Sequence, residues 1–149
     1  MNRLLALFAT LLLAAAALLP APARAAVDEA DLLPIDEAFA LTARATDAGE
    51  VEFTWKIADG YYLYRHRTSV QVQGAGFTAG ELRLPQGHAY TDEFFGDVET
   101  YRGELVAVQA GTVAPGATSA TFRVRYQGCA DVGVCYPPHS KDITVAFAG

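Results

Sequence analysis

Cys129 and Cys135 are the residues of this sequence whose type and spacing are best suited to chemistry. They are the only two cysteines in the 149 residues, and they enclose the loop ADVGV in the segment YQGCADVGVCYPPHSK. This loop, which contains Gly133, brings the two sulfurs within bonding distance if it folds back as a hairpin or as a single helical turn. Closing so short a loop removes little entropy from the unfolded chain, about 2 kcal/mol in the chain-entropy model. Such a bridge is better suited to being made and broken than to holding a fold together.

The residues alone leave three interpretations of this cysteine pair open. The first is a static disulfide that clips a hairpin in a secreted domain. The second is a redox-active pair that exchanges with the disulfides of other proteins. The third is a metal site formed by Cys129, Cys135 and His139, which needs a fourth ligand from elsewhere in the chain.

The segments that must position the cysteines have the alternating pattern of short β-strands. In EVEFTWKIADG, apolar residues alternate with polar ones from Val51 to Ile57, which predicts a strand with one buried face. After the turn at Asp59-Gly60, a second strand is expected in YYLYRHRTSVQV. Many short strands without a long helical period favour an all-β fold, an immunoglobulin-like antiparallel β-sandwich. Further strands are expected at residues 81–84, 104–110, 120–127 and 142–147.

The first 25 residues have the features of a secretory signal peptide. Arg3 gives a positive start, the stretch from Leu4 to Leu19 is almost wholly Leu and Ala, and Ala23-Arg24-Ala25 fits a small-x-small cleavage site. An apolar run of about 16 residues is short for a membrane span, which needs roughly 20. The sequence therefore predicts cleavage after Ala25 and export, which leaves residues 26–149 as one domain.

The charge of the mature chain limits the partners that it can bind. The whole sequence has a formal net charge of −6, and removal of residues 1–25 takes two arginines with it, which leaves −8. Such a surface repels nucleic acid and anionic lipid, so proteins or small neutral ligands are the expected partners. The mature chain is expected to begin with a lead-in at residues 28–41 that contains one helical turn near Pro34, and no later segment is expected to span a membrane.

Three motifs give the sequence a resemblance to a known family. DGYYLYR at 59–65, DEFFG at 92–96 and GCADVGVCYPP at 128–138 follow one another in this order. In order and spacing they resemble the N-terminal periplasmic domain of the thiol:disulfide interchange protein DsbD, over residues 34–145. The resemblance favours the redox-active interpretation of the cysteines, and it also implies an immunoglobulin-like fold.

The resemblance implies an activity and a set of partners. The domain would be the thiol:disulfide oxidoreductase component of a periplasmic protein-disulfide reductase. It would take electrons from a membrane-linked thioredoxin-like donor and pass them to periplasmic thioredoxin-like proteins of the disulfide isomerase and cytochrome c maturation types. No cofactor and no metal are implied, and a monomer is expected. The rival from another class is a non-catalytic immunoglobulin-like binding module with a structural disulfide.

The resemblance also implies roles for individual residues. Cys135 would form the mixed disulfide with a partner, and Cys129 would resolve it. A flexible cap loop, Asp92 to Gly96, would cover the disulfide with an aromatic ring that corresponds to Phe94. Two tyrosines of the YYLY motif, Tyr62 and Tyr64, would pack near the site.

The composition of the cap loop agrees with this assignment. Asp92 and Glu93 beside a thiol would raise its pKa, because a nearby negative charge disfavours the thiolate. A protonated thiol attacks slowly, so electrons would not leak to wrong disulfides. Phe94 and Phe95 lie between these acids and Gly96, which is able to act as a pivot. Without the resemblance, ordinary core packing is the alternative role for the two rings.

The sequence leaves the electron source open. Members of this family usually continue into a membrane domain with several helices and a carboxy-terminal thioredoxin-like domain. The 149 residues hold neither, so the chain is interpreted either as the first domain of a longer protein or as a free-standing version served by a separate membrane reductase. The choice between them affects the electron donor and not the thiol chemistry.

Overall fold

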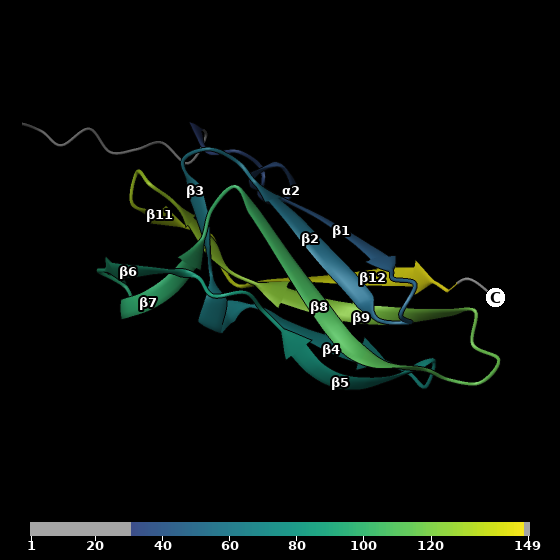
Figure 1. The fold of residues 1–149 in the computed structure, drawn as a ribbon. Helices are drawn as coiled ribbons and strands as arrows, with labels where there is room; N and C mark the ends of the chain where they lie inside the picture. The colour runs from purple at the N-terminus through teal and green to yellow at the C-terminus, as the bar shows by residue number, and fades with distance from the viewer. Residues whose placement is uncertain (1–30, 148–149) are drawn as a thin grey trace, which may run out of the picture.

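The structure is a computed structural model, and it describes residues 31–147 (Figure 1). The predicted signal peptide, residues 1–25, lies outside the described residues, as do the first residues of the predicted domain. A helical turn, α2 (Ile35–Ala38), follows Pro34 as expected. Twelve strands follow: β1 (Phe39–Ala45), β2 (Val51–Ile57), β3 (Tyr61–Tyr64), β4 (Ser69–Gln73), β5 (Phe77–Arg83), β6 (His88–Asp92), β7 (Gly96–Tyr101), β8 (Glu104–Val113), β9 (Ser119–Tyr126), β10 (Gly128–Ala130), β11 (Val134–Cys135) and β12 (His139–Ala146).

The strands form three antiparallel sheets, and two of them make a sandwich. The first sheet has the order β1-β2-β8-β5 and the second the order β12-β9-β4. A third sheet, β11-β10-β3-β7-β6, forms one end of the molecule, on the left in Figure 1. The all-β, immunoglobulin-like sandwich predicted from the strand pattern is confirmed.

The core lies between β2 and β9. Alternate residues of β2 are buried, including Phe53 and Trp55, which are both fully covered. The ring of Phe53 meets that of Phe122 at 5.5 Å, and the ring of Trp55 meets that of Tyr126 at 5.9 Å, both edge to face. Aromatic rings dominate core energetics through their large buried area. The predicted inward faces of both strands are therefore confirmed.

The segment YYLYRHRTSVQV was expected to be one strand, and this expectation is wrong. It forms β3 in the end sheet and β4 in the sandwich, separated by a 3₁₀ turn, η3 (Arg65–Arg67). Thr68 closes the turn, because its amide and its hydroxyl donate to the carbonyls of Arg65 and Tyr64. The break lets one stretch of chain pass from one sheet to another, so Tyr64 and its neighbours leave the sandwich and reach the cysteines.

Several strands were not predicted, and others have different bounds. The lead-in ends at Ala38, because β1 begins at Phe39. β6 was missed because its residues are mostly exposed, and β7 because it carries no run of alternating apolar side chains. The two strands pair with each other, from His88 opposite Thr100 to Asp92 opposite Gly96. Within residues 31–147, no helix is long and apolar enough to cross a membrane.

Candidate redox site

The two cysteines lie at the base of a short hairpin, where they form a disulfide. Cys129 on β10 faces Cys135 on β11, with their Cα atoms 3.9 Å apart. The turn between the strands is closed by a hydrogen bond from the amide of Gly133 to the carbonyl of Ala130, at 3.0 Å. Gly133 has a φ of +90°, which a residue without a side chain adopts at little cost. Of the two geometries considered for this loop, the structure has the hairpin.

The two sulfurs differ in exposure because β10 is an inner strand and β11 is an edge strand. β10 pairs with β3, with Cys129 opposite Tyr62 and Gly128 opposite Leu63. A Cβ atom at Gly128 would lie 2.4 Å from the carbonyl oxygen of Tyr62, so only glycine permits this approach. Cys129 is fully buried, whereas Cys135 is partly exposed. Cys135 is therefore the sulfur that an incoming thiolate reaches more easily.

The hydroxyl of Tyr64 lies next to both sulfurs. Its oxygen is 3.3 Å from Sγ of Cys129 and 4.0 Å from Sγ of Cys135. It also hydrogen-bonds to the carboxylate of Asp92. Burial raises the pKa of Tyr64, and the bond to Asp92 raises it further. The hydroxyl therefore keeps its proton. It donates this proton in a hydrogen bond to the Asp92 carboxylate, because a disulfide sulfur is only a weak acceptor.

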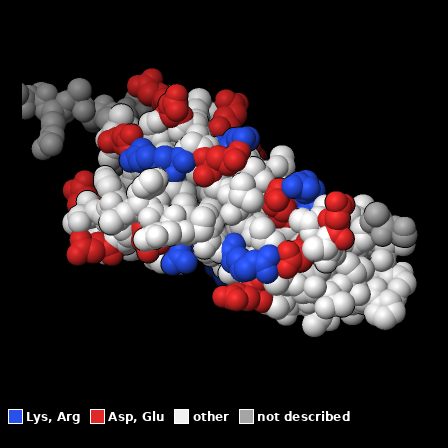
Figure 2. All heavy atoms as spheres, viewed as in Figure 1, with Lys and Arg blue, Asp and Glu red and all other residues white. Residues whose placement is uncertain are grey.

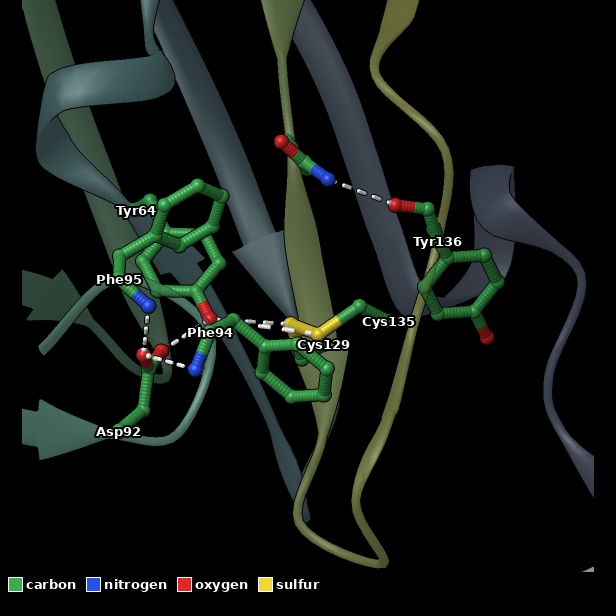
Figure 3. Close-up of a disulfide and its surroundings, with 8 residues drawn as sticks. Tyr64, Asp92, Phe94, Phe95, Cys129, Cys135 and Tyr136 are labelled. Atoms are coloured by element: carbon green, nitrogen blue, oxygen red, sulfur yellow. Dashed lines mark hydrogen bonds between the residues drawn. A yellow bond between two sulfur atoms is a disulfide. The ribbon is translucent and has the colours of Figure 1, made fainter.

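The cap loop is the tip of the β6–β7 hairpin. Oδ1 of Asp92 accepts hydrogen bonds from the amides of Phe94 at 3.0 Å and Phe95 at 2.7 Å. Gly96 closes the loop with a φ of +72°. Burial alone would raise the pKa of Asp92, but the bonds from Tyr64 and from the two amides outweigh it and hold this pKa below its usual value. One ionised carboxylate thus fixes both the loop and the tyrosine (Figure 3).

The two phenylalanines of the cap loop lie on different sides of it. Phe95, 37% exposed, packs edge to face on Tyr64 and on His66, each at 5.0 Å. The guanidinium carbon of Arg67 lies 4.6 Å from the centre of the same ring. Phe94 is 51% exposed, and in Figure 3 its ring projects over the disulfide. Neither ring belongs to the core, so the core-packing alternative is wrong.

Phe94 also borders a small pocket beside the hairpin. It shares this pocket with Tyr62 and with Ala130 and Gly133, the residues at the two ends of the hairpin turn. The cap loop and the hairpin therefore face each other across one cavity.

Tyr62 and Arg102, an arginine that was not predicted, also lie against the hairpin. The ring of Tyr62 packs on Tyr64 at 5.4 Å and on Tyr90 at 5.3 Å. The guanidinium of Arg102 lies 4.9 Å from the centre of the Tyr62 ring, and it donates to both carboxylate oxygens of Asp131 in the hairpin, at 3.1 and 2.8 Å. A bidentate pair of this kind fixes orientation as well as charge.

The structure brings most of the predicted site residues together. Tyr62, Tyr64, Asp92, Phe94 and Phe95 surround the disulfide. Glu93 also borders the pocket beside the hairpin. Asp92 contacts the Tyr64 hydroxyl, which lies next to both sulfurs. The expectation that Asp92 and Glu93 raise the pKa of a cysteine thiol stays a prediction. In the described part of the chain, no group of three or more His, Cys, Asp or Glu is placed to hold a metal ion.

Sequence reasoning missed several residues of the site: His66, Arg67, Tyr90 and Arg102. His66 is exposed, but its ring packs on Phe95. The signal that was available is the run of basic residue types directly after the YYLY motif. Acidic side chains are spread over the visible face of the molecule, with basic ones between them (Figure 2).

Comparisons with known proteins agree with this site. The family model described as "Thiol:disulfide interchange protein DsbD, N-terminal" matches residues 29–146. The chain is 46% identical over 129 residues to thiol:disulfide interchange protein DsbD of Ralstonia nicotianae, covering 86% of this chain and 20% of the relative. It is 37% identical over 131 residues to DsbD of Escherichia coli strain K12, covering 88% and 21%. The chain thus spans about a fifth of the length of these relatives.

Solved structures give the same result. The N-terminal domain of DsbD from Neisseria meningitidis in the reduced form has a TM-score of 0.72 and 32% identity, covering 83% of this chain and 96% of that one. A complex between the DsbD N-terminal and the PilB N-terminal domains from the same organism has a TM-score of 0.65 and 32% identity, covering 76% and 87%. The match contains both cysteines and the cap loop, and this chain belongs to the family of N-terminal domains of the thiol:disulfide interchange protein DsbD.

Proposed function

We propose that this chain is a thiol:disulfide exchange domain that relays electrons through the Cys129–Cys135 pair. It acts as the reductase component that takes electrons from a membrane-linked thioredoxin-like donor and reduces thioredoxin-like oxidoreductases of the periplasm, including those of the disulfide isomerase and cytochrome c maturation types. Residues 1–25 direct its export. The observation that carries the proposal is the unequal exposure of the two bonded sulfurs beneath a surface loop.

The exchange proceeds in two steps that move two electrons. In the reduced domain, the Cys135 thiolate attacks a sulfur of the partner's disulfide, which forms a mixed disulfide and releases one partner thiolate. Cys129 then attacks Sγ of Cys135, which closes the Cys129–Cys135 disulfide and releases the second partner thiolate. The two protons of the domain's thiols end on the partner. Oxidised domain is returned to the dithiol by the reverse steps with a dithiol donor.

The surrounding residues limit this exchange to docked partners. The cap loop keeps Phe94 over the disulfide in the free protein, and it moves aside when a partner docks. Tyr64 donates its one proton to Asp92 and presents its oxygen to both sulfurs, where it accepts a hydrogen bond from a cysteine thiol of the reduced domain. Asp92 holds that hydroxyl and the loop in one arrangement. Small thiols, which offer no docking surface, do not offset the free energy of opening the cap.

The proposal is tested by trapping the mixed disulfide. As a probe we choose the PilB N-terminal domain, which is found with a DsbD N-terminal domain in a solved complex. The Cys129→Ala variant, which keeps the attacking sulfur and lacks the resolving one, is expected to accumulate a covalent adduct. The matched Cys135→Ala variant is expected to give none. An adduct formed only by Cys135→Ala would reverse the two roles.

The reduction potential separates this function from a structural disulfide. Structural bridges typically lie below about −300 mV, whereas exchanging pairs are more oxidising. We expect the Cys129–Cys135 pair to equilibrate with glutathione above that value. A potential below it, together with no adduct in either variant, would favour the non-catalytic binding module.

A further inference from the structure

Two arginines without a carboxylate partner line the same pocket. Residues 31–147 contain nine Lys and Arg side chains, and seven of them form an ion pair. The remaining two are Arg67, in η3, and Arg125, on β9. Both border one cavity of about 180 Å³ between η3 and the start of β12. An acidic protein therefore leaves two guanidinium groups unneutralised at one place.

Tyr126 also borders this cavity, although its ring packs on Trp55 on the core face of β9, opposite to the face that carries Arg125. Tyr126 is 1% exposed, and its hydroxyl makes no hydrogen bond within the described residues. Burial raises the pKa of Tyr126 to about 12, with a further contribution from Asp36, so the hydroxyl keeps its proton. Asp36 is already ion-paired with Lys141, at 2.7 Å. The Tyr126 hydroxyl thus belongs to the core side of β9, and the two arginines are the donors that this pocket offers to an anion.

Five further residues border the cavity. They are His66, Ser69, Gln127, Pro138 and His139. Burial and the charge of Arg67 both lower the pKa of His66, and they outweigh the opposite effect of Asp92. The ring of His139 packs on Tyr126 at 5.3 Å. Two arginine charges in a cavity of this size match one or two anionic oxygens rather than a polyanion.

The pocket adjoins the cap loop. Arg67 and His66, which form one wall, are also the residues that contact the ring of Phe95. Pro138 and His139, on the opposite wall, follow closely after Cys135. A protein that contacts the cap loop at Phe95 therefore meets Arg67 and His66 as well. This position favours a side chain of the docking protein over a free metabolite as the occupant.

We propose that this pocket binds the carboxylate of an Asp or Glu side chain of the protein that docks at the Cys129–Cys135 disulfide. The identity of the occupant as a redox partner rests on the proposed function. Arg67 and Arg125 donate charge-assisted hydrogen bonds to the carboxylate. Such a contact sets the orientation of the partner and speeds its association, which a disulfide exchange needs.

The test uses a blocked tri-glutamate peptide as the probe and follows its binding to the oxidised protein by NMR titration of the Tyr126 and Gln127 amides. Wild type is expected to show saturable binding that weakens between 20 and 300 mM NaCl. The double variant Arg67→Gln/Arg125→Gln is expected to bind at least about tenfold more weakly, and Arg125→Gln alone about threefold. The matched control Arg44→Gln/Arg83→Gln, which removes two arginines paired with Glu52 and Glu50, is expected to bind within twofold of wild type.

Two results would overturn the proposal. Equal weakening in both double variants would show that only net charge matters. Tighter binding of inorganic phosphate than of the peptide would reassign the pocket to a phosphate ligand. The titration involves no thiol chemistry, so it is independent of the trapping experiment: peptide binding without any adduct refutes the proposed function and leaves the site. Adduct formation without peptide binding refutes the site alone.

Discussion

Replacement of Phe94 by alanine tests whether the cap controls access to the disulfide. The ring is 51% exposed, so about half of its surface is covered when the loop is closed. Full burial of a phenylalanine side chain stabilises by about 1.5–3 kcal/mol, so the closed cap gains roughly 0.8–1.5 kcal/mol from this ring. If opening precedes attack by a small thiol, Phe94→Ala should speed that attack by about 4- to 12-fold.

The assay measures two rates for the oxidised protein. One is the rate of its reduction by dithiothreitol, and the other is the rate of its exchange with the PilB N-terminal domain. The rate with dithiothreitol should rise by the factor above, and the rate with the protein partner should rise less, because docking itself opens the cap. Val132→Ala is the matched control, since Val132 is 57% exposed at the hairpin tip and borders a different pocket. Its rates should equal those of wild type.

The exposure of Phe94 also limits the loss of stability expected from Phe94→Ala. A half-exposed ring should cost less than about 1.5 kcal/mol of unfolding free energy when it is removed. Unchanged rates with both reductants, together with a loss of roughly 3–5 kcal/mol, would identify Phe94 as a packing residue. In that case the gate would have to lie elsewhere.

Three further predictions follow from the site. Reduction of the Cys129–Cys135 disulfide should lower the melting temperature and leave a cooperative transition, since the short loop adds only about 2 kcal/mol; loss of the transition in a thermal scan would show that the bridge holds the fold. Gly128→Ala should destabilise by about 2–3 kcal/mol in urea unfolding, because the new Cβ meets the Tyr62 carbonyl at 2.4 Å; a change below about 0.5 kcal/mol would mean that the hairpin shifts freely. The lowered pKa of Asp92 means that its stabilisation of the closed cap is complete above the unfolded pKa of about 4 and is lost as pH falls through the lower folded pKa. Reduction by a phosphine should therefore accelerate in wild type relative to Asp92→Asn below pH 4, and parallel profiles would contradict this role.

Local chemistry in the sequence was enough to predict the inward faces of the long strands. Apolar and polar residues alternate in β2 and β9 because one face of each strand is buried. This period of two residues is expected in any sandwich that uses these strands. The same logic failed for β6 and β7, which lack this alternation and form strands because β7 pairs with β6 on one side and with β3 on the other. It also failed at Arg65–Arg67, where a 3₁₀ turn carries the chain from the end sheet into the sandwich.

By itself, the sequence determined which atoms can do chemistry: two cysteines around a five-residue loop, and motifs whose order resembles one family. Both are properties of the covalent chain, so they do not depend on how the chain folds. Only the tertiary structure decided that Cys129 is buried and Cys135 reachable, because pairing with β3 covers one strand of the hairpin and leaves the other at an edge. It also decided that Arg67 and Arg125 share a pocket, since residues 58 positions apart meet only when strands from different parts of the chain pack together.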